Sequence, residues 1–225
     1  MDIAILKAEI THEPVREKVC DVTDLYKTFF SGHTTTFFDV CQGVYPQKKH
    51  DLYVLTGSAA SAYDNTPWVK TLQKFVVDNS KERFLGICFG HQLIAEALGG
   101  KVAKVLWNLG AREVTIQQHE KWMVTKPEKL YAIFNHKDQV VTLPNNAKLL
   151  AGNDIVPIQM YCIEKRILCM QCHPEYIPSY QKVLMNHIKN VIGDVTVIEE
   201  AMRSYQENKS IFSMKLWIER FFNMQ

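Results

Sequence analysis

The hydrophobic positions of the first hundred residues follow two alternating spacings. Short apolar runs, typical of buried strands, occupy residues 3–7, 37–40, 51–55 and 84–87. Between these runs, apolar residues recur every three or four positions, as they do along one face of a helix. The helical stripes run from Val15 to Phe29, from Trp68 to Val76 and from Leu93 to Leu98. Alternating strands and helices predict a parallel sheet with helices on both faces.

Local signals indicate where these helices begin and end. Thr66 precedes Pro67, a residue that is favoured at the first position of a helix, so Thr66 is the expected cap. Gly32 and the pair Gly99-Gly100 are typical helix-ending residues. We therefore expect the stripe from Val15 to Phe29 to form one helix that ends near Gly32.

The spacing changes after about residue 101. Short β-like pieces follow one another at residues 101–105, 112–116, 129–134, 139–143, 148–151, 157–163 and 167–172. After Pro178, three helical stripes occupy residues 183–192, 197–205 and 214–221, which we interpret as packing elements. The predicted fold class is therefore α/β: a doubly wound, mostly parallel sheet with helices on both faces, a small antiparallel extension and C-terminal helices.

Composition restricts the class of protein further. With 225 residues, 47% hydrophobic and 22% charged, the chain is expected to form one domain over residues 1–225, with a core at 1–190 and a helical extension at 191–225. A net charge of +2 without a basic stripe argues against nucleic acid as a partner. No apolar run reaches bilayer length, and the first residues resemble a strand rather than a signal peptide. We expect a cytoplasmic protein without membrane contact.

The six cysteines give two alternatives to buried, reduced thiols. A disulfide framework is typical of small secreted chains, which this chain does not resemble. Cys169 and Cys172 form a C-x-x-C followed by His173, but no second pair of ligands completes a four-ligand metal site. We predict neither a metal nor a cofactor.

The first candidate for chemistry is the segment Gly86-Ile87-Cys88-Phe89-Gly90-His91-Gln92. It has the G-x-[nucleophile]-x-G form of a sharp turn from a strand into a helix. Only small flanking residues allow the close backbone approach at such a turn, and the nucleophile adopts a strained conformation. The turn would place Cys88 at the N-terminus of a helix that begins near His91, where the helix dipole favours a thiolate.

The second candidate is His173-Pro174-Glu175, which follows an apolar strand. Pro174 favours an extended backbone at His173. Residues two apart in an extended chain point to the same side, so Glu175 can orient the His173 ring. Taken separately, His173 would be interpreted as a capping or packing residue and Glu175 as a solvent-exposed residue of a first helical turn. Together with Cys88 they supply a nucleophile, a base and a residue that orients the base.

With these motifs the chain resembles the class I glutamine amidotransferases, which use a Cys-His-Glu triad in a doubly wound, flavodoxin-like fold. The resemblance covers residues 1 to about 190. Phe134-Asn135-His136-Lys137-Asp138-Gln139-Val140 resembles a family loop that helps to hold the substrate. Thr56-Gly57-Ser58 resembles the loop after the third strand. This loop, the pair Tyr63-Asp64 and the C-terminal helices are most similar to free-standing, GMP-synthase-like amidotransferases and γ-glutamyl peptidases.

The resemblance implies a role for each residue. Cys88 would attack the γ-carbonyl of glutamine or of a γ-glutamyl group, His173 would move the proton, and Glu175 would orient His173. The backbone N–H groups of Gly57 and Phe89 would form the oxyanion hole. The substrate would lie against three further residues, namely Gln92, Asn135 and His136. Thr56 departs from the more common Gly-Gly-Pro loop, which leaves the mobility of this loop open.

Three functions remain possible at this stage. The first is hydrolysis of a γ-glutamyl amide through a thioester on Cys88. The second is a glutaminase subunit that delivers ammonia to a separate synthase, because the chain contains no phosphate loop of its own. The third is a pseudoenzyme that senses a glutamine-like ligand or the oxidation of Cys88. The complete triad favours an enzyme over a sensor.

Overall fold

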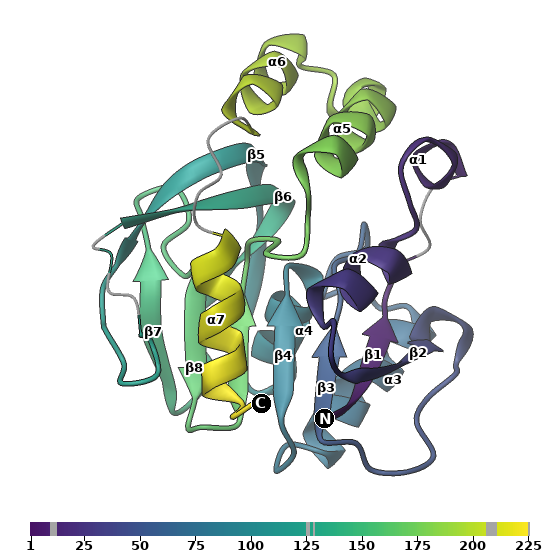
Figure 1. The fold of residues 1–225 in the computed structure, drawn as a ribbon, viewed down its shortest axis with the longest axis vertical. Coiled ribbons are helices and arrows are strands. Elements are labelled where there is room, and N and C mark those ends of the chain that lie inside the picture. Colours follow the sequence, from purple (N-terminus) through teal and green to yellow (C-terminus); the bar gives the residue numbers. More distant parts are fainter. Residues whose placement is uncertain (10–12, 125–126, 128, 206–210, 225) are drawn as a thin grey trace.

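A computed structural model describes residues 1–9, 13–124, 127, 129–205 and 211–224. Within this part of the chain, nine strands form one sheet in the order β2-β1-β3-β4-β9-β8-β7-β5-β6 (Figure 1). The strands are β1 (Asp2–Lys7), β2 (Thr34–Asp39), β3 (Leu52–Leu55), β4 (Phe84–Ile87), β5 (Lys101–Ile116), β6 (Lys129–Thr142), β7 (Ala147–Gly152), β8 (Met160–Ile163) and β9 (Ile167–Met170). The helices are α1 (Glu13–Lys18), α2 (Val22–Phe29), α3 (Pro67–Asp78), α4 (Phe89–Ala97), α5 (Pro178–Ile192), α6 (Val195–Ser204) and α7 (Ile211–Phe221), with a short 3-10 helix, η1 (Val40–Gln42).

The two faces of β1 carry two parts of the core, because successive side chains of a strand point to opposite sides. Ile3 and Ile5 pack with residues of α2 and α7. Ala4 and Leu6 pack with residues of α3 and α4. The strands β2, β1, β3, β4 and β9 pair in parallel. The doubly wound α/β class predicted from the sequence is therefore confirmed.

The other half of the sheet, from β9 through β8, β7 and β5 to β6, is antiparallel. The prediction of two short pieces at 101–105 and 112–116 was wrong, because β5 is one long strand, and β6 likewise joins 129–134 to 139–143. Polar residues obscured this continuity. Asn108 pairs with His136 in the middle of both strands, beside a register shift between Lys104 and Asn108.

The expected single helix from Val15 to Phe29 is two helices, α1 and α2. Asp21 interrupts it, because its side chain accepts a hydrogen bond from the Thr23 N–H while Asp24 bonds back to the Asp21 N–H. Such a reciprocal capping box starts a new helix. Thr66 precedes α3 as expected, but its side chain makes no capping hydrogen bond.

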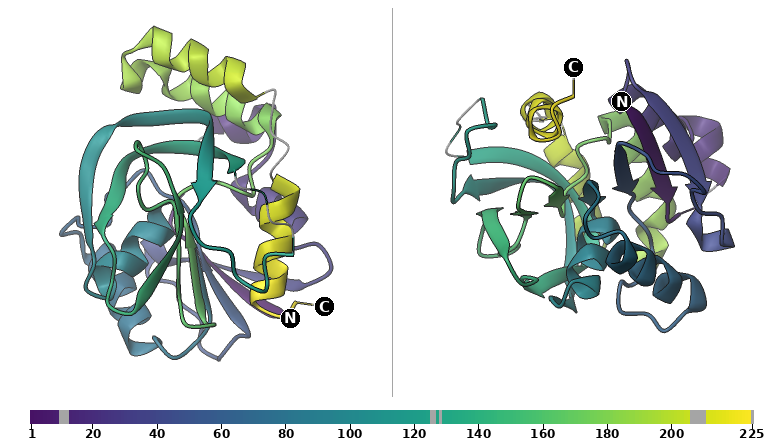
Figure 2. Two further views of the ribbon diagram at one scale, coloured as in Figure 1. Left: turned by 90° about the vertical axis from the view of Figure 1, so that its left-hand side faces the viewer. Right: turned by 90° about the horizontal axis from the view of Figure 1, so that it is seen from below.

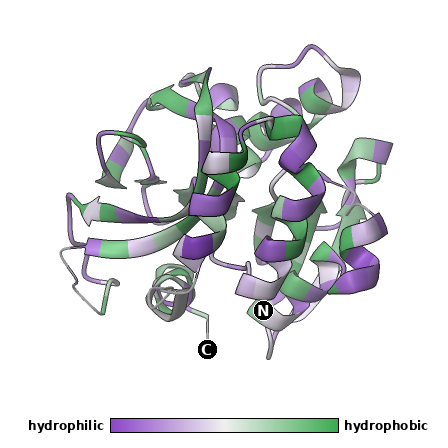
Figure 3. Cartoon of the chain, turned by 90° about the horizontal axis from the view of Figure 1, so that it is seen from above, coloured by the Kyte–Doolittle hydropathy of each residue, from purple (hydrophilic) through white to green (hydrophobic). Residues whose placement is uncertain are grey.

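The helices α5 and α6 lie together at one end of the molecule, over the long strands β5 and β6 (Figures 1 and 2). Their apolar residues join Val15 of α1 and Leu109 of β5 in a third cluster. Hydrophobic and hydrophilic residues occur together on the outer helices, as amphipathic covers of a sheet require (Figure 3). Among the helices of the described residues, none combines the length and the apolar character that a bilayer crossing would need.

Candidate active site

Cys88 lies at the turn between β4 and α4, in a strained backbone conformation. Its φ is 52° and its ψ is −104°, values that non-glycine residues rarely adopt. A Cβ added to Gly90 would lie 2.3 Å from the Leu55 carbonyl oxygen, and one added to Gly86 would lie 2.8 Å from the Gly90 backbone. Gly90 is therefore required by the close packing of the turn against β3, and Gly86 by the close packing of the turn on itself, as the motif predicts.

The helix after this turn begins earlier than expected. α4 starts at Phe89 rather than near His91, which makes Cys88 its N-cap residue. The first backbone N–H groups of a helix have no acceptor within the helix. Cys88 is therefore the residue that opens α4, and of the first N–H groups of this helix that of Gly90 donates to the Thr56 carbonyl oxygen at 3.1 Å.

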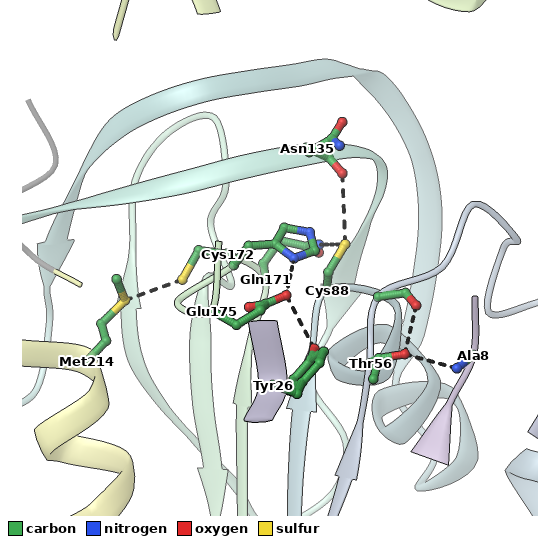
Figure 4. Close-up of polar contacts among 11 residues, drawn as sticks. Ala8, Tyr26, Thr56, Cys88, Asn135, Gln171, Cys172, Glu175 and Met214 are labelled. Carbon is green, nitrogen blue, oxygen red and sulfur yellow. Dashed lines mark hydrogen bonds and ion pairs between the residues drawn. The ribbon is translucent and has the colours of Figure 1, made fainter. Parts of the chain in front are cut away.

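His173 and Glu175 lie beside this turn, just beyond the end of β9. The backbone N–H of His173 donates to the Ile133 carbonyl oxygen, which fixes the segment against β6. His173 Nδ1 lies 2.8 Å from Glu175 Oε1, and both side chains are buried. Glu175 Oε1 also accepts a hydrogen bond of 3.3 Å from the hydroxyl of Tyr26 in α2 (Figure 4).

The charge state of His173 depends on these neighbours. Burial by itself would lower the pKa of His173. The negative charges of Glu175 and Cys88, and the hydrogen bonds from both, outweigh burial, so the pKa of His173 lies well above its usual value. The ring also stacks on Tyr176, with centroids 4.0 Å apart and planes within 5°. Cys88, His173 and Glu175, which the sequence singled out, are brought together.

The loop after β3 closes the site from the other side. A Cβ added to Gly57 would lie 2.9 Å from His173 Cε1 and 3.8 Å from Cys88 Cβ, so this loop touches both side chains. Thr56 holds the loop in place, because its hydroxyl donates to the Gly57 carbonyl and accepts from the Ala8 N–H (Figure 4). Thr56 is therefore a tether between β3 and β1.

A cavity of about 570 Å³ opens above the Cys88 thiol. One part of its wall comes from the loop after β3 and from α3, α4 and β6: Ser58, Ala59, Ala60, Trp68, Gln92, Asn135, His136, Lys137 and Asp138. The other part comes from the end of β1, from α1, η1 and β5, and from α5 with the segment before it: Ala8, Glu9, Val15, Cys41, Trp107, Tyr176, Tyr180, Leu184, Ile188 and Val191. We call the first wall the β6 end and the second wall the α5 end. Cys88 and His173 line the same cavity.

The three expected substrate residues all line the β6 end. Residues 135–138 do not form a loop as the family resemblance suggested, because they belong to the continuous strand β6. The Asn135 carbonyl accepts from the Cys88 thiol at 3.9 Å. Gln92 Nε2 donates to the Asp138 carbonyl at 2.6 Å and to Gln171 Oε1 at 3.1 Å, and so links α4 to β6.

Hydrogen bonds continue from this link to the surface loop. Gln171 Nε2 lies 3.7 Å from Cys88 Sγ. The Asp138 carboxylate accepts from the hydroxyls of Ser61 at 2.5 Å and Tyr63 at 3.0 Å. Burial, with the nearby charge of His173, lowers the pKa of His136 to about 3, so this imidazole is neutral.

Two further cysteines near the site, Cys169 and Cys172, are buried in the core. Cys172 Sγ accepts from Gln159 Nε2 at 2.9 Å and lies 3.5 Å from Met214 Sδ. Burial raises the pKa of Cys169 to about 12, and it raises the pKa of Cys172 as well. Within the described residues, no group of three or more histidine, cysteine, aspartate or glutamate side chains is arranged to hold a metal ion.

Several residues at the cavity were not predicted. Tyr26 and Gln171 support the expected trio, and Glu9, Trp107 and the apolar face of α5 form much of the wall. Tyr176 carried a local signal, since it directly follows Glu175. The other residues reach the cavity through contacts between distant segments, which cannot be predicted from the local sequence.

Comparison with known proteins places the chain in a family. The family model for glutamine amidotransferase class-I matches residues 31–191, so the chain belongs to the class I glutamine amidotransferases. γ-Glutamyl peptidase 4 of Arabidopsis thaliana is 37% identical over 64% of this chain and 63% of its own length. A glutamine-hydrolyzing GMP synthase subunit of Methanococcus aeolicus is 36% identical over 49% of this chain and 61% of its own length.

These aligned regions span less than two thirds of either relative. A solved structure of a glutamine amidotransferase from Thermotoga maritima matches the fold with a TM-score of 0.79, at 19% identity, and covers 98% of this chain and 97% of its own. The fold predicted from the sequence and the family resemblance are both confirmed.

Proposed function

We propose that this protein hydrolyses γ-glutamyl amide bonds, in glutamine or in γ-glutamyl peptides, through a thioester on Cys88. One observation carries the proposal: the Cys88 turn, the buried His173–Glu175 pair and the Gly57 loop meet at one cavity. The similarity to γ-glutamyl peptidase 4 supports the same chemistry. The reaction uses three side chains, two backbone N–H groups and water.

The first half of the reaction forms the thioester. The raised pKa of His173 means that its ring already holds the proton of the Cys88 thiol, and the thiolate sulfur attacks the γ-carbonyl carbon of the substrate. The carbonyl oxygen becomes an oxyanion, which the backbone N–H groups of Gly57 and Phe89 stabilise. Each such donor is worth about 3 kcal/mol when it points at the developing charge. The C–N bond then breaks, and His173 gives its proton to the leaving amine.

The second half releases glutamate. His173 takes a proton from water, whose oxygen attacks the thioester carbonyl, and the C–S bond breaks to restore the thiol. Glu175 acts on His173 in both halves. Its carboxylate accepts the Nδ1–H at 2.8 Å, which leaves Nε2 free to face the thiol and stabilises the charged ring. The Tyr26 hydroxyl in turn holds the carboxylate.

The glutamyl group binds at the β6 end of the cavity, where polar groups are concentrated. Gln92, Asn135 and His136 form this wall, with Lys137 and Asp138 beside them. Because the Gln92 amide nitrogen already bonds to Asp138 and Gln171, Gln92 acts mainly by fixing the shape of the wall. The neutral His136 is a hydrogen-bonding partner rather than a charge.

The test uses two matched cysteine variants. Cys88→Ala is expected to abolish release of glutamate from glutamine and from γ-glutamyl peptides, since it removes the nucleophile. Cys172→Ala, a buried thiol that packs against Met214, is expected to retain most of the activity. Mass spectrometry of the wild type during turnover should show a glutamyl adduct on Cys88. Unchanged turnover in Cys88→Ala would refute the mechanism.

A second candidate function is a glutaminase subunit that supplies ammonia to a separate synthase. The similarity to the GMP synthase subunit of Methanococcus aeolicus favours this candidate. Glutamine turnover by the purified chain should then be slow and should rise when the synthase component is added. Full glutaminase or peptidase activity without any addition would select the free-standing hydrolase.

A further inference from the structure

The α5 end of the cavity begins directly behind the base. His173 stacks on Tyr176, and Tyr176 contacts Tyr180 with ring centroids 4.9 Å apart. Under the proposed function, His173 gives its proton to the leaving nitrogen, so this nitrogen must lie against the His173 ring. Whatever is attached to that nitrogen therefore extends along the wall that continues from Tyr176.

That wall is one face of α5. Tyr180, Leu184, Ile188 and Val191 are spaced by four, four and three residues, the spacing of a single helical face. Leu184 and Ile188 are partly buried, whereas Val191 is 76% exposed and marks the mouth of the cavity. Cavities of about 300–1,000 Å³ hold drug-sized ligands, so 570 Å³ leaves room for more than a glutamyl group. The α5 end is thus suited to an apolar chain.

One carboxylate interrupts this apolar wall. Glu9 lines the cavity just after β1, next to Ala8, whose N–H is bound to Thr56 of the site loop. Among the described residues that line the α5 end, Glu9 is the charged one, and no described side chain forms a hydrogen bond or ion pair with it. Burial raises the pKa of Glu9 to about 7, although the charge of His173 partly opposes this. Glu9 is partly buried, and a carboxylate in such a setting that forms no ion pair is stabilised when a cation binds beside it.

We propose that the α5 end is a leaving-group subsite that selects γ-glutamyl amides of amines with an apolar chain and a second, positively charged group, and that Glu9 binds this group. The inference rests on the proposed hydrolysis and specifies its substrate class. The apolar chain lies along Leu184 and Ile188, and the cation reaches the Glu9 carboxylate. A leaving group that ends in a carboxylate is disfavoured by the like charge.

The experiment compares three amides that differ only in the end of the leaving group. These are the γ-glutamyl amides of 1,5-diaminopentane, of pentylamine and of 5-aminopentanoate, which end in an ammonium, a methyl and a carboxylate group. For the wild type, kcat/KM is expected to be about tenfold higher for the diamine amide than for the pentylamine amide, and lower still for the carboxylate. The measured quantity is the ratio of kcat/KM between two amides. A loss of activity that affects all amides equally therefore leaves this ratio unchanged.

Two substitutions at Glu9 test its role. Glu9→Gln keeps the shape and removes the charge, so the ratio between the diamine and pentylamine amides should fall to about one. Glu9→Lys should reverse the order in favour of the carboxylate amide. Glu13→Gln is the matched control, since Glu13 is exposed on the neighbouring helix α1 and does not line the cavity. It should leave the ratio as in the wild type. Circular dichroism establishes that each variant folds, and Glu9→Gln decides the test if Glu9→Lys does not fold.

The outcomes separate the two proposals. If the wild type releases glutamate from none of the three amides nor from glutamine, the proposed hydrolysis is wrong. If it hydrolyses all three amides equally, prefers the carboxylate, or keeps its preference in Glu9→Gln, the leaving-group subsite is wrong while hydrolysis stands. A preference for the diamine amide that disappears in Glu9→Gln and persists in Glu13→Gln supports the subsite.

Discussion

The two ends of the cavity are built in different ways. At the β6 end, hydrogen bonds fix the wall: the hydroxyls of Ser61 and Tyr63 bind the Asp138 carboxylate, and Gln92 binds the Asp138 carbonyl. At the α5 end, apolar packing of helices holds the wall, and Glu9 stands without a partner among the described residues. Directional bonds fix one geometry, whereas apolar contacts tolerate changes of similar volume. The β6 end is therefore suited to the constant glutamyl group and the α5 end to a variable leaving group.

If the ends divide recognition in this way, changes at the reacting centre between them should affect all substrates equally. Glu175→Gln removes the charge that stabilises the protonated His173 ring and replaces one carboxylate oxygen by an amide nitrogen, which donates and cannot accept the Nδ1–H. We expect kcat to fall by about 10³–10⁴-fold, with both glutamine and a long γ-glutamyl amide. Steady-state kinetics with the two substrates measure the effect.

Tyr26→Phe is the control for this change. It keeps the ring and removes only the 3.3 Å hydrogen bond to Glu175, so we expect a loss of about threefold to tenfold. If Glu175→Gln reduced kcat much more for one of the two substrates than for the other, Glu175 would act on the leaving group rather than on the reacting centre.

A second change at the centre acts through shape. In Gly57→Ala the new Cβ would lie 2.9 Å from His173 Cε1, and the ring cannot retreat freely because it stacks on Tyr176 at 4.0 Å. Displacing the loop would move the Gly57 N–H away from the oxyanion, so we expect kcat to fall by about 10²–10³-fold while KM changes little. Kinetics and a thermal melt of the variant check this. An unchanged kcat would show that Gly57 supplies no oxyanion donor.

The centre was also the part that could be predicted from the sequence. Close backbone contacts can be met only by glycine, so Gly86 and Gly90 mark the turn around Cys88 in the sequence itself. His173 and Glu175 could be predicted because Pro174 restricts the chain between them. Their meeting with Cys88 followed from the rule that sites form at the carboxyl ends of parallel strands.

The walls could not be predicted in the same way. Asn108 and His136 are polar residues within paired strands, so their segments read as loops until the pairing is known. The face of α5 that lines the cavity is as apolar as any packing face, and only its position over Tyr176 makes it part of the site. Glu9 follows a strand and carries no motif. These features depend on contacts between distant segments, which local patterns do not encode.

Acid should weaken the protein through two buried imidazoles on the β6 side. Burial lowers the pKa of His91 and of His136 to about 3, whereas an unfolded histidine titrates near 6.5. Between these pH values the unfolded state binds more protons than the folded state, so stability falls as the pH drops below about 6.5. At pH 5 each imidazole should lower the free energy of unfolding by about 2 kcal/mol.

Urea unfolding at pH 7 and pH 5 measures this loss. His136→Gln should reduce the loss by about 2 kcal/mol, because one of the two neutral imidazoles is gone. An equal loss in the wild type and in His136→Gln would show that other groups cause the acid sensitivity. Glu9 at the α5 end acts in the opposite sense, because its pKa is raised to about 7 and the folded state therefore takes up a proton there that the unfolded state does not, which stabilises the fold as the pH falls from 7 to 5.

The smallest effects should separate the two ends most sharply. Asp138→Asn replaces the acceptor of Ser61 and Tyr63 by a group that cannot accept both hydrogen bonds equally well. We expect KM to rise by about tenfold for glutamine and for a long γ-glutamyl amide alike, since both carry the glutamyl group.

Ile188→Ala removes part of the apolar wall of the α5 end. It should raise the ratio of KM for the long amide to KM for glutamine by about threefold to tenfold. Ile192→Ala is the matched control, because Ile192 lies on the same helix and packs in the same cluster without lining the cavity. If Ile188→Ala leaves that ratio unchanged, or if Asp138→Asn changes it, then recognition is not divided between the two ends of the cavity.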